Sequence, residues 1–194
     1  METKAVLSGI AVVLTIVGYA PYIIDILKGK TKPHIFSWLS GSVAATIATL
    51  LQLLGGAGVG AWVMSTVAIA CFIIFLLSFK YGTKDITKSD VAVLLLSFTV
   101  LLLWLVADQP VLSIILLTVS QLLAFLPTIR KSWHDPYSET TVFYQISGVR
   151  HIFAILALEQ FNILTALYSL AWVVSNFGTA LMLSIRRKVV DKKL

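Results

Sequence analysis

Seven apolar segments, joined by short polar or glycine-rich connections, account for most of this 194-residue chain. Most approach the roughly 20 residues that a helix needs to cross a membrane. Only 12% of the residues are charged, whereas a soluble domain carries about 25%. The sequence therefore predicts an all-α polytopic membrane protein with seven transmembrane helices. The predicted spans are residues 5–27, 35–54, 60–79, 91–106, 111–126, 141–158 and 163–185.

The basic residues lie almost entirely on one side of the predicted membrane. Thirteen of the 15 Lys and Arg residues fall in the first, third and fifth connections and in the C-terminal tail. Because cytoplasmic loops are enriched in Lys and Arg, we predict an external N-terminus and a cytoplasmic C-terminus in a plasma (inner) membrane. The net charge of +6 then reflects topology, and we expect no nucleic-acid partner. Pro21 disfavours signal-peptide cleavage, so the first segment is predicted to be a true span.

The two halves of the chain match each other at a nearly constant spacing. At an offset of 106 to 107, the matches include Pro21 with Pro127, Ser40 with Ser147, and Gly41 with Gly148. The offset grows to 110 at a W-V-x-S pattern that begins at Trp62 and again at Trp172. We therefore predict two three-helix repeats, residues 1–82 and 110–194, joined by a linker helix within 83–109. The single extra span gives both repeats the same orientation.

This 3+1+3 arrangement, with Pro21 and Pro127 at the cytoplasmic ends of the first and fifth helices, resembles the SWEET/PQ-loop superfamily of membrane transporters. The resemblance is to a divergent member, and it implies transport of a sugar or a vitamin-like solute, since nicotinamide-riboside carriers share the layout. It also implies that Asn176 matches a seventh-helix Asn that holds substrate. The KDEL receptors are built on a similar architecture, so a non-transporting receptor or assembly factor is the alternative.

Two faces that carry aromatic and polar side chains supply the predicted substrate-binding site. Positions i, i+3 and i+4 share one face of a helix, so each W-V-x-S run directs an indole and two polar groups the same way. These runs predict as binding residues Trp62, Ser65, Thr66, Tyr168, Trp172, Ser175 and Asn176. We expect the two faces to meet across the pseudo-symmetry axis. The alternative is that they pack helices together, as small and polar side chains also do.

Arg150 completes the predicted site, and two prolines supply its predicted hinge. Arg150 lies about 15 Å into the sixth segment, where an arginine normally faces a cavity or the bundle interior. It is either a clamp for a substrate carboxylate, with His151 as a titrating neighbour, or a structural hub. Pro21 and Pro127 either end their helices or kink them as hinges for alternating access.

The sequence offers no residues for catalysis or metal binding. It contains no nucleophile with an adjacent base, no paired carboxylates and no metal-ligand spacing, and its single Cys71 excludes an intrachain disulfide. We therefore expect no enzyme activity, no cofactor and no metal. A buried Asp or Glu pair for ion coupling is also missing, which favours a facilitator. The expected partners are the lipid bilayer and a small-molecule substrate, and a homo-oligomer is left open.

Overall fold

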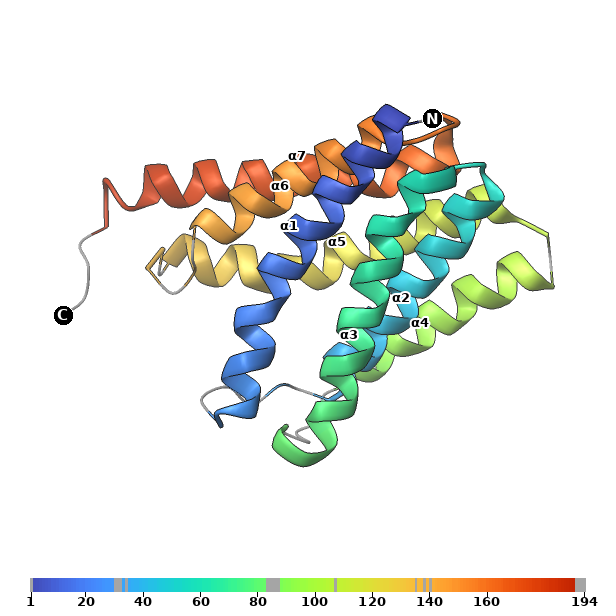
Figure 1. Cartoon of the computed structure of the whole chain (residues 1–194). Coiled ribbons are helices and arrows are strands. Elements are labelled where there is room, and N and C mark those ends of the chain that lie inside the picture. The colour runs from blue at the N-terminus through green and yellow to red at the C-terminus, as the bar shows by residue number, and fades with distance from the viewer. Residues whose placement is uncertain are drawn as a thin grey trace.

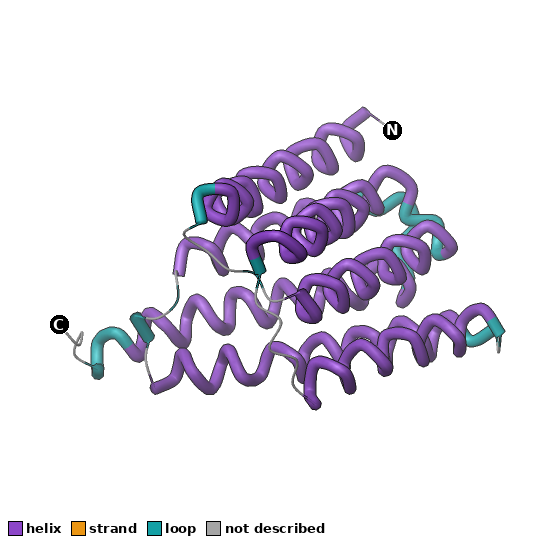
Figure 2. The backbone as a smooth tube through the Cα atoms, turned by 90° about the horizontal axis from the view of Figure 1, so that it is seen from below, coloured by secondary structure: helices purple, strands orange, loops and turns teal. Residues whose placement is uncertain are grey.

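The structure is a computed structural model that describes residues 2–29, 33, 35–82, 88–106, 108–134, 136–137, 139 and 141–190. Within these residues the regular secondary structure is helical, without strands, which confirms the predicted all-α class (Figure 2). The helices are α1 (Glu2–Leu27), α2 (Ile35–Leu54), α3 (Trp62–Tyr81), α4 (Lys88–Leu105), α5 (Pro110–His134), α6 (Thr141–Leu156) and α7 (Ile163–Arg186). A short 3₁₀ turn, η1 (Gly58–Ala61), precedes α3.

Five helices are long and apolar enough to cross a membrane: α1, α2, η1 together with α3, α5 and α7. Their outward faces carry large apolar side chains, including Val13, Ile69 and Leu181, which are 57%, 61% and 62% exposed. Such a surface is stable in lipid and costly in water. The chain is therefore a helical membrane protein. At 16 residues, α6 is shorter than the 17 to 25 residues of an ordinary span.

The predicted segments reproduce the helices to within a few residues, and the residues of α2 match the prediction. The main difference is α5, which was expected to end at residue 126 and instead runs through Pro127 to His134. In the same way, α1 runs through Pro21 to Leu27. Neither proline therefore ends its helix, so that alternative is wrong for both.

The helices pack in the same order in each half of the chain. In the first half α3 packs against both α1 and α2, and in the second half α7 packs against both α5 and α6. The halves meet where α1 packs on α6 and α2 packs on α5 and α7, while α4 packs against α2 and α5. In Figure 1, α1 and α3 run downward and α5 and α7 run to the left from a shared region near the N-terminus. The two groups thus converge at one end and separate toward the other.

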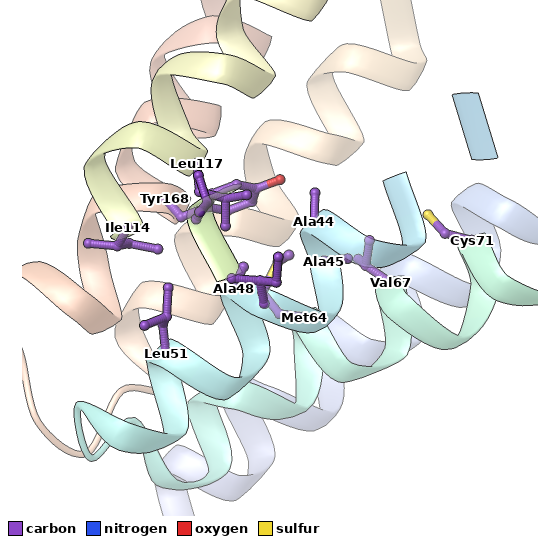
Figure 3. Close-up of a cluster of buried hydrophobic side chains, with 12 residues drawn as sticks. Ala44, Ala45, Ala48, Leu51, Met64, Val67, Cys71, Ile114, Leu117 and Tyr168 are labelled. Atoms are coloured by element: carbon purple, nitrogen blue, oxygen red, sulfur yellow. The ribbon is translucent and has the colours of Figure 1, made fainter. Parts of the chain in front are cut away.

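A buried apolar cluster fixes the halves together beside the cavity described below (Figure 3). It contains three small residues of α2, namely Ala44, Ala45 and Ala48, packed near Met64 of α3 and Tyr168 of α7. Small side chains let helix backbones approach closely, and close packing drives helix association in lipid. The cluster therefore holds α2 as the element shared between the two groups.

Candidate functional site

A cavity of about 570 Å³ lies between the two groups of helices. The described residues that line it come from α1, α2 and α3 on one side, from α5, α6 and α7 on the other, and from the connection at residue 139. Its volume falls within the 300 to 1,000 Å³ that is typical of small-molecule sites. The cavity is thus a solute-sized site between the halves.

Aromatic rings form much of the cavity wall. The aromatic lining residues are Tyr19, Tyr22, Trp38, Phe125, Phe143, Tyr144, Tyr168 and Trp172. Trp172 lies at the centre of several ring contacts. Its ring centroid lies 5.5 Å from that of Phe125 and 6.2 Å from that of Tyr168. The His151 ring lies nearly parallel to it, at 14° and 6.5 Å. Walls of this kind bind the apolar or flat faces of a solute.

Asn176 brings a hydrogen-bonding group to this aromatic wall. Its side chain is only 4% exposed and lines the cavity. The amide nitrogen donates to the backbone oxygen of Trp172, one turn earlier in α7, at 2.7 Å. That bond fixes the orientation of the amide and leaves its carbonyl oxygen as the atom that can accept a hydrogen bond from a solute.

Arg150 places a positive charge in the same cavity. Among the described residues, its only hydrogen-bond partner is the neighbouring His151, whose Nε2 lies 3.3 Å from a terminal guanidinium nitrogen. The Nε of Arg150 is buried and has no partner. The guanidinium also lies 6.0 Å from the centroid of the Tyr19 ring. It makes no hydrogen bond to Gln121, Tyr144, Gln145 or Glu159, the polar residues nearest to it in its own and the adjacent segments.

Two connections pair with each other at the end where the helix groups converge, and we call them the loop seal: residues 55–60 and residues 157–162. Their backbones pair directly, because the amides of residues 159 and 160 donate to the carbonyls of residues 57 and 56, each at 3.1 Å. The side chain of Asn162 adds a bond to the carbonyl of residue 55 at 2.7 Å. From α1, Lys4 donates to the backbone oxygen of residue 158 at 2.7 Å and Ser8 to that of residue 59 at 2.5 Å. The seal therefore joins both halves at the end predicted to be external.

At the opposite, basic end, hydrogen bonds connect elements of the second half. Arg186 donates to the backbone oxygen of Trp133 at 2.9 Å, and Arg187 donates to that of Pro136 at 2.9 Å. These bonds tie the end of α7 to the connection between α5 and α6. The cavity lining reaches this connection at Glu139, which accepts a bond from the Tyr144 hydroxyl at 3.0 Å. The cavity thus extends from the middle of the helices toward the basic end.

The structure brings together four of the predicted site residues: Arg150, Tyr168, Trp172 and Asn176 all line the cavity. Ser175 lies beside them on α7 but is not part of the lining.

The face predicted on α3 does not take part in the cavity. Trp62 is 50% exposed on the outside of the protein, at the first residue of α3. The hydroxyls of Ser65 and Thr66 donate to backbone oxygens of their own helix at 3.0 and 2.8 Å. The expected meeting of the Trp62 and Trp172 faces is therefore absent. The reason is rotational: α3 turns Met64 and Val67 toward the cavity, and an exposed Trp at the end of a span suits the membrane interface instead.

The two predicted hinge residues lie within helices that border the cavity. Pro21 lies inside α1 between Tyr19 and Tyr22, which both line the cavity. Pro127 lies within α5, but its side chain is outside the described part of the structure. A proline inside a helix removes one backbone donor and weakens the helix there.

Several cavity residues had no distinguishing signal in the sequence. Tyr19, Trp38 and Phe125 are aromatic residues in apolar segments, where most such residues face lipid. Met64 and Cys71 lie in α3 among side chains of similar hydrophobicity. A helix that is apolar on all sides gives no pattern to show which face looks inward, so these residues were missed.

Together, the fold and the cavity define a class: a helical membrane protein with a solute-sized site between two helix groups. Comparison of the chain with protein-family models, with curated proteins and with solved structures gave no match.

Proposed function

We propose that this protein is a membrane transporter of a small polar solute, a facilitator of the SWEET/PQ-loop kind that works by alternating access. The observation that carries the proposal is a solute-sized cavity lined by both helix groups, which one interlocked pair of loops joins at one end of the helices. A fold alone does not determine function, so the site must carry the inference.

The proposed 3+1+3 architecture, with seven spans, is supported by the helix packing. In each half the third helix packs against the other two, as a duplicated unit would. The described residues of the helices that line the cavity belong to α1–α3 and α5–α7, which fits α4 as the linker between the repeats. Parallel repeats of this kind commonly hold their substrate where the repeats meet.

In the proposed cycle, the structure corresponds to a state reached from the basic side, which we assign to the cytoplasm. A solute enters from that side and contacts Trp172 and Asn176. The helix groups then close at the basic end, with Pro21 and Pro127 as hinges, while the loop seal separates. Because residues 55–60 belong to one half and residues 157–162 to the other, rocking the halves apart opens the seal without unfolding a helix.

The native cysteine provides a direct test of alternating access. Cys71 is the only cysteine in the chain, and it lines the cavity near the middle of α3. A small membrane-impermeant methanethiosulfonate is added to oriented vesicles from one side or the other, and modification of the protein is followed by mass spectrometry. A transporter must be modified from both sides, because its cavity opens to each in turn.

Two cysteine variants serve as controls for this labelling experiment. Cys71→Ser removes the reaction, and Ala45→Cys in that background places a second reporter in the same cavity. If both reporters react only from the basic side under all conditions, the transport proposal is wrong. The one-sided cavity would then fit a non-transporting receptor, and solute flux into proteoliposomes should be absent.

A further inference from the structure

Three residues that line the cavity hold buried donor atoms without acceptors, so this part of the lining is rich in donors. Buried nitrogen atoms of Arg150, His151 and Gln121 have no hydrogen-bond partner, and all three residues line the cavity. A buried polar atom without a partner costs free energy, so such atoms in a binding site are normally satisfied by the ligand.

The contact between Arg150 and His151 identifies the histidine nitrogen that donates. A guanidinium carries only donors, so the Nε2 atom of His151, 3.3 Å away, must accept. A neutral imidazole that accepts at Nε2 carries its proton at Nδ1, which is the atom left without a partner. The unpartnered atoms of Arg150 and His151 are therefore both N–H donors, and they require an acceptor.

The charge in the cavity narrows the choice of acceptor to an anion. Among the described residues, Arg150 is the only Lys or Arg in the lining, and its sole hydrogen-bond partner is uncharged. An unpaired charge at membrane depth is costly and normally has a counter-charge. A planar guanidinium matches the two oxygens of a carboxylate. The single cation Arg150 pairs with a single negative charge, and Glu139, further along the same lining, disfavours the nearly two charges of a phosphate monoester.

We propose, building on the transport function above, that the solute is a small organic monocarboxylate with an aromatic or apolar body. Its carboxylate pairs with Arg150 beside His151, and its body lies between Trp172 and the apolar wall formed by Ala45 and Met64. This arrangement gives the Arg150 guanidinium a counter-charge and leaves the aromatic wall to contact the remainder of the solute.

Matched acids and amides test the charge requirement at nearly constant shape. The probes are benzoate with benzamide, nicotinate with nicotinamide, and indole-3-acetate with indole-3-acetamide. Binding to the full chain in phosphatidylcholine nanodiscs, which contain no anionic lipid, is measured by the rise in thermal stability and by protection of Cys71 from modification. A ligand that binds only the folded state raises its apparent stability by mass action.

We expect at least one acid to bind about tenfold to a hundredfold more tightly than its amide, as a charge-assisted hydrogen bond predicts. Arg150→Gln should bring acid and amide to equal affinity, whereas Arg150→Lys should keep part of the preference. Asn176→Ala is the matched control within the cavity, and it should weaken an acid and its amide alike.

The possible results separate this inference from the proposed function. Equal binding of acid and amide by the parent protein, no binding of any probe, or a preference that survives Arg150→Gln would each overturn the carboxylate inference. If Arg150→Gln does not fold, the inference is tested by comparing acid with amide binding in the parent protein and in Arg150→Lys. None of these results affects the labelling of Cys71 from the two sides of the membrane, which is the test of the transport proposal.

Discussion

Replacing Gly58 by alanine should weaken the loop seal selectively. Gly58 has a φ of +56°, a conformation that residues with a Cβ rarely adopt. A Cβ built at this position would also overlap the carboxylate of Glu159, in the other half of the seal. The substitution therefore combines backbone strain with a clash across the contact that must separate during transport.

The size of the effect follows from the backbone strain and from the clash with Glu159. A left-handed conformation costs an alanine about 1–2 kcal/mol. Glu159 is exposed and its side chain can rotate away, at the loss of a weak contact of 3.5 Å to the amide of Val59. We therefore expect about 1–2 kcal/mol in total, which is a shift of about 5- to 30-fold in favour of the state with the seal open.

Labelling Cys71 from one side of the membrane at a time measures the shift toward the state with the seal open. In Gly58→Ala, the rate of modification from the seal side should rise by this factor relative to the parent. Gly29→Ala is the matched control, because Gly29 has a φ of +69° but nothing within 4 Å of its Cβ position, and it lies at the basic end. If the two variants give the same labelling from both sides, the loops at 55–60 and 157–162 do not gate the cavity.

Three further substitutions test other parts of the structure. Asn162→Ala removes the N-cap of α7 and should lower stability by about 1–2 kcal/mol, seen as a lower melting temperature in detergent. Gly148→Ala places a Cβ 2.7 Å from an aromatic ring of α7 and should destabilise by about 1–3 kcal/mol, whereas Gly178→Ala, with open space around it, should not. Pro21→Ala restores a backbone donor within α1, so it should raise the melting temperature and slow solute flux without weakening solute binding. Pro110→Ala at the first residue of α5, where proline is tolerated, is its control.

The helices were predictable because their boundaries depend on local chemistry. Apolar length, charged connections and the glycine-rich turn at 55–58 predicted six of the seven helices to within a few residues. The exception is the end of α5, where Pro127 was taken as a boundary. A proline clashes mainly with the preceding turn, so a helix held in place by its neighbours can continue past it.

The cavity was predictable only where polarity marks the inward face. In α7, Asn176 and Tyr168 identify that face, and the prediction there agrees with the lining of the cavity. In α3 every face is apolar, so the prediction depends on the sequence motif that Trp62 shares with Trp172. That shared motif predicts equivalent positions for the two side chains, and the structure does not show them. Trp62 is the first residue of α3, whereas Trp172 is the tenth residue of α7, so the two motifs lie at different distances from the starts of their helices. A shared motif at an offset of 110 therefore does not place two side chains at equivalent positions.

The uneven distribution of charge across the cavity leads to a last prediction, about exchange. The hydrogen bond described for Arg150 is to the uncharged His151, and the described residues of α1–α3 in the lining carry no charge. An empty carrier must therefore enclose an unpaired guanidinium each time both ends close, whereas a carrier loaded with a monocarboxylate encloses a neutral pair. Because burying an unpaired charge costs several kcal/mol more than burying a pair, the loaded carrier should reorient faster. Uptake of a labelled carboxylate into proteoliposomes should then rise by about tenfold or more when unlabelled carboxylate is present inside. Equal rates with and without internal carboxylate would show that reorientation does not depend on the charge of Arg150.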